Sequence, residues 1–226
     1  MKGKFKQTLN STGFIILLGL VVVPILSFLL ITSSEESPLY ASISRIAWAL
    51  DHWWATFIWA IVVMASILWL TYKTIGCGPL SLPCRVSLTV AQFFNISMVF
   101  IGCIIFPAKT GQGEPMLINY LHDYVTIIAW VLYGVGLIVY SFMLGRHSSL
   151  LGYLGIGLMT FTVFSSYFFI KQVIHPDSYV GASAVSEVHI INSLLIFLVV
   201  IHVAQKYEEQ IRTSNSTNQA AAAIKH

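Results

Sequence analysis

Six runs of mostly apolar residues, with no Lys, Arg, Asp or Glu over their centres, constrain this chain more than any other feature. A helix that crosses the hydrocarbon core of a bilayer needs about 20 such residues. Only 9% of the residues are charged and 57% are hydrophobic, whereas about 25% are charged in a soluble domain. The sequence therefore predicts an all-α integral membrane protein with six transmembrane helices. The predicted spans are 13–32, 53–72, 86–108, 122–145, 148–170 and 187–205.

The connections between these runs are too short to hold a separate domain. Residues 1–205 are therefore predicted to form one six-helix transmembrane bundle, and 206–226 a polar tail of low complexity that is frayed or disordered. The first run is longer than the core of a signal peptide and has no Ala-x-Ala site after it, which indicates a retained span. The composition excludes nucleic-acid binding and a secreted disulfide scaffold.

The basic residues predict the orientation, because cytoplasmic loops carry an excess of Lys and Arg. With both termini inside, nine of the twelve basic residues are cytoplasmic and three are outside. The outer three are Arg45, Lys109 and Lys171. We therefore expect both termini in the cytoplasm.

Histidine and carboxylate residues are paired at the outer starts of three helices. The pairs are Asp51 with His52, His122 with Asp123, and Glu187 with His189. Ionisable groups at this depth usually face the bundle interior and pair with one another. The three pairs can therefore converge on one polar site at the outer face.

Such a site supports two kinds of chemistry. Neutral imidazole and carboxylate groups bind transition metals, and zinc is favoured here, with His52, His122 and His189 as ligands. Asp51, Asp123 or Glu187 then serves as a general base or orients a ligand. Without metal, the same residues form a structural network or a proton relay. The alternative is that the residues form no common site. Acidic residues at helix starts then stabilise the helix through its dipole, and interfacial histidines anchor the chain at the membrane surface.

Other features of the sequence give weaker signals. Arg45 lies on a short stretch before the second span and can bind a lipid phosphate or pair with Glu35 or Glu36. A haem is disfavoured because matched histidines are lacking at the inner level. Gln92 and Asn95 share a helix face, which predicts an interhelical hydrogen bond.

The outer loop leading into SRIAWALDHWW, the FPA end of the third span, the LHD motif and SEVHIINSLL resemble a family of small bacterial membrane proteins. This family is catalogued as domain of unknown function 998, and the resemblance covers 13–205. It implies the bacterial plasma membrane and no assigned activity. A looser similarity connects the chain with membrane hydrolases of the alkaline ceramidase and progestin-receptor type. It implies that Ser44, Asp51, His122 and His189 surround a zinc ion, although these hydrolases have seven helices.

Two hypotheses therefore stand. The first is a metal-dependent hydrolase that acts on a lipid or lipid-linked substrate, with Ser44 and Arg45 at the substrate. The second is a non-enzymatic sensor, accessory subunit or small proton-linked transporter. Membrane lipids are the expected partners in both, and a second copy of the chain or another membrane protein is an open alternative.

Overall fold

The computed structural model describes residues 11–33, 42–43, 46, 53–105, 116–173 and 183–223, with side chains at 11–33, 42–43, 46, 54–102, 124–167 and 183–216. Within this part of the chain, six helices are long and apolar enough to cross a membrane, which confirms the prediction of an all-α protein with six such helices. The helical segments are α2 (Thr12–Leu17), α3 (Val23–Thr32), α5 (Trp53–Thr71), α6 (Leu82–Ile105), α7 (Met116–His147), α8 (Ser149–Val173) and α9 (Ala184–Ala223). Two π-helical turns, η1 (Leu18–Val22) and η2 (Tyr72–Gly76), complete the first and second spans.

The first span changes from α-helix to a π-helical turn just before its proline. The Val23 amide donates to the Leu18 carbonyl, five residues back, and Pro24 stands in the first turn of α3. Proline has no N–H to donate, and its ring clashes with the carbonyl four residues earlier in an α-helix. A π-turn is the usual adjustment at such a position, so the span stays continuous.

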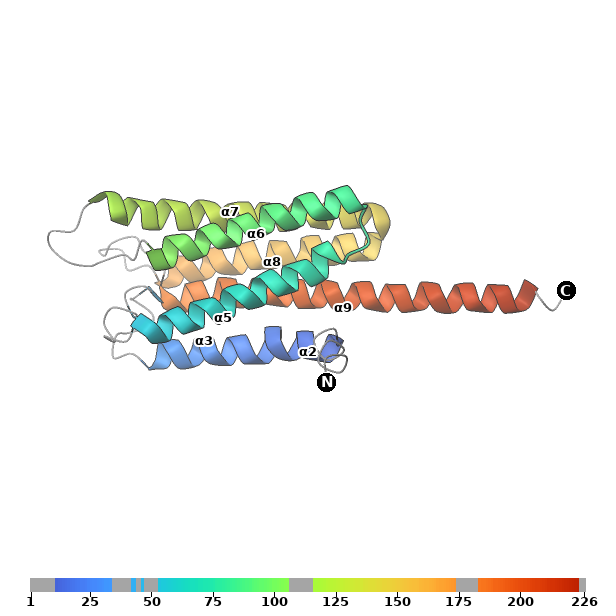
Figure 1. The fold of residues 1–226 in the computed structure, drawn as a ribbon, viewed down its shortest axis with the longest axis horizontal. Coiled ribbons are helices and arrows are strands. Elements are labelled where there is room, and N and C mark those ends of the chain that lie inside the picture. Colours follow the sequence, from blue (N-terminus) through green and yellow to red (C-terminus); the bar gives the residue numbers. More distant parts are fainter. Residues whose placement is uncertain are drawn as a thin grey trace.

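The chain enters and leaves the bundle at the same end (Figure 1). We call this the terminal end, where α2 begins, α6 begins and α7 turns into α8. The opposite, far end holds the last residue of α3 and the first residues of α5 and α9. An even number of crossings requires this arrangement.

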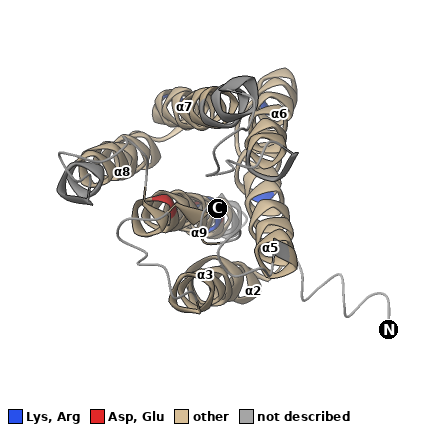
Figure 2. Ribbon diagram, turned by 90° about the vertical axis from the view of Figure 1, so that its left-hand side faces the viewer, with Lys and Arg blue, Asp and Glu red and all other residues tan. Residues whose placement is uncertain are grey.

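Helix α9 lies at the centre of the bundle, surrounded by the other helices (Figure 2). Its span is 61% buried, against 17% for the span of α6. Buried apolar residues of α9, among them Leu195, Phe197 and Leu198, form the core together with Ile67 and Leu70 of α5. Of the spans, that of α9 therefore has the smallest share of its surface open to lipid, and most of its polar side chains lie inside the protein.

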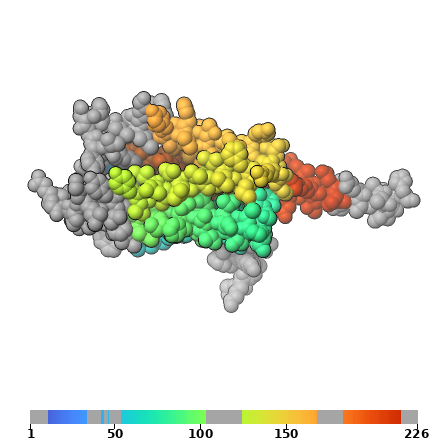
Figure 3. All heavy atoms as spheres, turned by 90° about the horizontal axis from the view of Figure 1, so that it is seen from above, coloured from blue at the N-terminus to red at the C-terminus, as the bar shows by residue number. Residues whose placement is uncertain are grey.

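Helix α9 also continues far beyond the bundle at the terminal end (Figures 1 and 3). Helix extends through Ala223, so the prediction of a disordered tail at 206–226 was wrong for most of that segment. The packed part of α9 supplies the costly helix nucleus, and the polar residues that follow need only extend it.

Helices α7 and α8 approach each other through small residues. A Cβ added at Gly152 would lie 2.9 Å from the Gly145 nitrogen, and one at Gly155 would lie 2.5 Å from Ser141 Oγ. Small residues permit such close helix packing in a bilayer. Gly157 of the same helix does not take part in this contact, since it has open space around its Cβ position.

Replacing Gly152 with alanine should destabilise the bundle by about 1–3 kcal/mol, because the helices must move apart to admit the methyl group. Gly157→Ala is the matched control and should be neutral or slightly stabilising, since alanine is the better helix former. Thermal unfolding of both variants in detergent measures the difference. Equal stability of the two would contradict the close packing of α7 and α8.

Candidate functional site

Helices α5, α7 and α9, near whose starts the three His–carboxylate pairs were predicted, all begin at the far end (Figure 1). Six of the predicted site residues have no described side chain: Ser44, Arg45, Asp51, His52, His122 and Asp123. Their convergence on one site therefore stays a prediction. Only Glu187 and His189 can be placed.

Glu187 anchors a neighbouring segment of the chain. Its Oε2 accepts a hydrogen bond of 2.8 Å from the backbone amide of Ile43, and the Ile46 amide donates to the Ser42 carbonyl within the same segment. A carboxylate that binds the first amides of a helical turn satisfies donors that the turn itself leaves free. Glu187 thus holds this segment onto the start of α9, which is a structural role.

An apolar cluster reinforces this anchor. Ile43 and Ile46 are buried against residues of α3 and of the first turns of α9, namely Leu30, Ile31, Ala184 and Val188. The carboxylate of Glu187 therefore lies at the edge of a packed apolar contact. Hydrogen bonds are strengthened where water is excluded in this way.

His189 connects α9 with α8. Its Nε2 lies 2.9 Å from Ser165 Oγ, and Ser165 Oγ also lies 3.3 Å from the Thr162 carbonyl oxygen. The hydroxyl has one proton, which it gives either to the imidazole or to the carbonyl. In the first case His189 is the acceptor, the arrangement of a nucleophile and its general base; in the second, His189 donates in an ordinary interhelical bond.

Glu187 and His189 do not complete a metal site with other described residues. Among the described side chains, no three His, Cys, Asp or Glu residues lie close enough to hold one ion. The prediction of a zinc site therefore depends on His52 and His122, which lie outside those side chains.

A buried polar network joins α6 and α7 near the middle of the bundle. Gln92 Nε2 donates to the Tyr133 carbonyl at 2.7 Å, and Asn95 Nδ2 donates to Gln92 Oε1 at 3.1 Å. Thr71 Oγ1 lies 2.7 Å from Tyr133 Oη. The interhelical bond predicted for Gln92 and Asn95 is confirmed, with Gln92 forming it and Asn95 orienting the amide.

A second network, which the sequence analysis missed, lies at the terminal end around η2. Tyr140 Oη donates to the Thr74 carbonyl and accepts from Gln205 Nε2, both at 2.6 Å, and Thr74 Oγ1 donates to the Leu198 carbonyl at 3.0 Å. His202 is 4% exposed, and its Nδ1 has no hydrogen-bond partner among the described residues. The end of η2 frees its last carbonyl groups, and the side chain of Tyr140 on α7 binds the carbonyl group of Thr74.

Between the polar residues at the two ends, α9 is apolar. The stretch from Leu194 to Ile201 holds only Leu, Ile, Phe and Val, and all of it except Ile196 and Val200 is buried. At 1.5 Å per residue this belt is about 12 Å long. The described side chains of α9 therefore offer no continuous path for a proton or ion.

At the terminal end, α9 clasps the α7–α8 turn. Ser148 Oγ donates to Glu208 Oε1, and Arg212 Nη1 donates to His147 Nε2 at 3.0 Å. Arg212 Nη2 also lies 3.6 Å from Glu208 Oε2. We call these four residues the terminal clasp.

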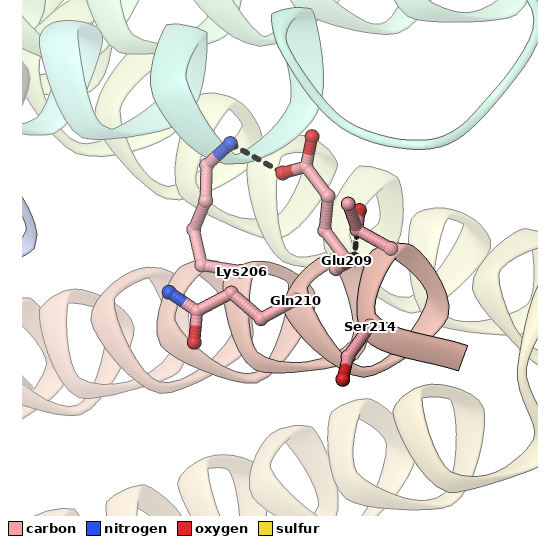
Figure 4. A pocket seen from close by; sticks show the side chains of 5 residues that line it. Lys206, Glu209, Gln210 and Ser214 are labelled. Carbon is pink, nitrogen blue, oxygen red and sulfur yellow. Dashed lines mark hydrogen bonds and ion pairs between the residues drawn. The ribbon is translucent and has the colours of Figure 1, made fainter. Parts of the chain in front are cut away.

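A hollow of about 390 Å³ lies on α9 at the terminal end (Figure 4). All five residues that line it belong to α9: Lys206, Glu209, Gln210, Thr213 and Ser214. Lys206 Nζ and Glu209 Oε2 form an ion pair of 2.7 Å across it. It is thus the open side of one exposed helix with its charges neutralised, and we assign it no ligand.

Comparison of the chain with models of protein families, with curated proteins and with solved structures gives no match.

Replacing Tyr140 with phenylalanine should lower the free energy of unfolding by about 1–3 kcal/mol, because the Thr74 carbonyl and the Gln205 amide lose a buried partner. Tyr153→Phe is the control, since Tyr153 is 77% exposed on α8, and should change stability little. Unfolding of both variants in detergent provides the measurement. A Tyr140→Phe protein as stable as the control would show that this network contributes nothing.

Proposed function

We propose that this chain is a non-enzymatic multi-pass protein of the bacterial plasma membrane, a sensor or accessory subunit with both termini in the cytoplasm. In this proposal α9 transmits changes at the outer face to its cytoplasmic extension. The far end is then the outer face, and the terminal end is cytoplasmic.

The observation that supports this proposal is the continuity of α9 between two sets of polar contacts. Glu187 and His189 bind neighbouring elements at the far end, and Glu208 and Arg212 bind the α7–α8 turn at the terminal end. The apolar belt between them favours mechanical coupling over conduction. A packed core transmits displacement because it is dense and little compressible.

The charge distribution supports the orientation. Every Lys and Arg whose side chain is described lies at the terminal end: Lys73, Arg85, Arg146, Lys206 and Arg212. This is the distribution that the positive-inside rule associates with the cytoplasmic face. Titration of imidazole and carboxylate groups at the outer face is one signal that such a protein can respond to.

Glu187→Ala should loosen the terminal clasp although the clasp lies at the other end of α9. Removing the acceptor for the Ile43 amide releases the segment at the start of α9, and we expect amide hydrogen exchange to accelerate at 148–152 and 206–213. Hydrogen exchange with mass spectrometry on the detergent-purified chain measures this.

Thr32→Val is the control, because Thr32 Oγ1 at the same end binds only carbonyl groups of its own helix, at Phe28 and Leu29. It should leave exchange at the clasp unchanged. Faster exchange confined to the far end in Glu187→Ala would contradict the coupling role.

A second candidate function is a membrane hydrolase that acts on a lipid or lipid-linked substrate. The distance of 2.9 Å from His189 Nε2 to Ser165 Oγ favours it, because a serine is activated when a base takes its proton as the oxygen attacks an ester carbonyl. Zinc bound at His189 through the same nitrogen would exclude this use. The two versions of the hydrolase can therefore be tested separately.

If Ser165 is a nucleophile, a fluorophosphonate probe should label the purified chain, and Ser165→Ala and His189→Ala should both abolish the label. Ser166→Ala, at the adjacent hydroxyl, is the control and should keep the label.

If the site holds zinc, elemental analysis should find about one ion per chain, and His122→Ala should lose it. If the chain takes up neither label nor metal, both versions of the hydrolase are contradicted and the sensor is the remaining proposal.

A further inference from the structure

We infer that a second hollow at the terminal end, lined by the start of α6 and the end of α7, binds the phosphate of an anionic phospholipid. This hollow has a volume of about 240 Å³. Its lining residues are Pro79, Leu80, Ser81, Cys84, Met143, Arg146 and His147. Unlike the hollow on α9, it is built from two helices and the loop between α5 and α6.

Arg146 provides the charge that recognises a phosphate. Its side chain is exposed, and it forms no ion pair with the carboxylates whose positions are described, since Glu208 pairs with Arg212 and Glu209 pairs with Lys206. A guanidinium presents two parallel N–H groups that fit two oxygens of one phosphate. The hollow therefore contains an uncompensated cation of the right shape.

His147 adds a hydrogen-bond donor. Arg212 has only donors, so His147 Nε2 must accept the bond of 3.0 Å between them, and the proton of the neutral ring must stand on Nδ1. The Ser81 hydroxyl is another donor among the lining residues. One cation with two neutral donors suits a phosphate monoanion.

The depth of the hollow fits a lipid headgroup. Arg146 is the penultimate residue of α7, whose 32 residues extend about 48 Å at 1.5 Å per residue. The hydrocarbon core is only about 30 Å thick. The last turn of α7 therefore reaches the level of the lipid phosphates.

Apolar rows on the same two helices favour a lipid over a free phosphate ion. Leu82, Val86, Val90 and Phe94 repeat every fourth residue along α6 and are 53–64% exposed, and α7 exposes Val135, Val139 and Phe142. The two helices present one continuous surface (Figure 3). Acyl chains can lie along it while the headgroup occupies the hollow, a mode of lipid recognition by basic sites between membrane helices.

Native mass spectrometry of the full chain in detergent tests this inference. Titration with phosphatidylglycerol should show one tightly bound lipid per chain, with an affinity about tenfold above that for phosphatidylcholine. Arg146→Gln should reduce the phosphatidylglycerol affinity about tenfold, because one charge-assisted contact is lost. Arg146→Lys should reduce it less, since the charge stays and the paired donors are lost.

Lys206→Gln is the matched control, a cation at the same end outside the hollow, and should leave the affinity unchanged. The inference is overturned if Arg146→Gln binds phosphatidylglycerol as the parent chain does, or if Lys206→Gln weakens binding equally, which would indicate a diffuse surface potential. Saturable binding of inorganic phosphate that competes with the lipid headgroup at equal affinity would assign the hollow to a soluble anion instead. If Arg146→Gln does not fold, the loss in Arg146→Lys decides the question.

Discussion

A central helix whose span is 61% buried among the other membrane spans has little water for its polar side chains, and the rest of this structure depends on that constraint. In hydrocarbon, each unsatisfied polar group costs several kcal/mol. Helix α9 nevertheless carries Glu187, His189 and Gln205, each of which finds a partner on another element. Asn192 Oδ1 and His202 Nδ1 are buried on the same helix without a hydrogen-bond partner among the described residues. The bonds that do form fix the orientation of α9 within the bundle and hold Ile43 against its first turns.

The same constraint separates the two ends of the molecule. Polar residues of α9 occur near the far and terminal ends, while the belt from Leu194 to Ile201 is apolar and mostly buried. A proton relay needs polar groups at short intervals, and along α9 this belt interrupts them for about 12 Å. A rigid helix, in contrast, is well suited to connect an outer contact with the terminal clasp, and for this reason we favour transmission over transport.

The spans and their class could be predicted from sequence because hydropathy over about 20 residues reflects the thickness of the bilayer directly. That Gln92 and Asn95 lie on one face of their helix could also be predicted, since residues three apart share a helix face. The bonds from His189 to Ser165 and from Glu187 to Ile43 could not, because they depend on the rotation and register of helices distant in sequence. The extension of α9 was missed because its composition indicates disorder, whereas a helix already nucleated by packing continues through polar residues at little cost.

The most direct measurement is the distance between spin labels at positions 196 and 216 on α9, determined by pulsed electron paramagnetic resonance in lipid nanodiscs. Both positions are exposed, one at the lipid face of the bundle and one on the extension. A continuous helix predicts a single narrow distribution near 30 Å, from 1.5 Å per residue. A broad distribution centred at shorter distances would show that the extension is not helical, and α9 could then not transmit a change at the far end to the terminal end.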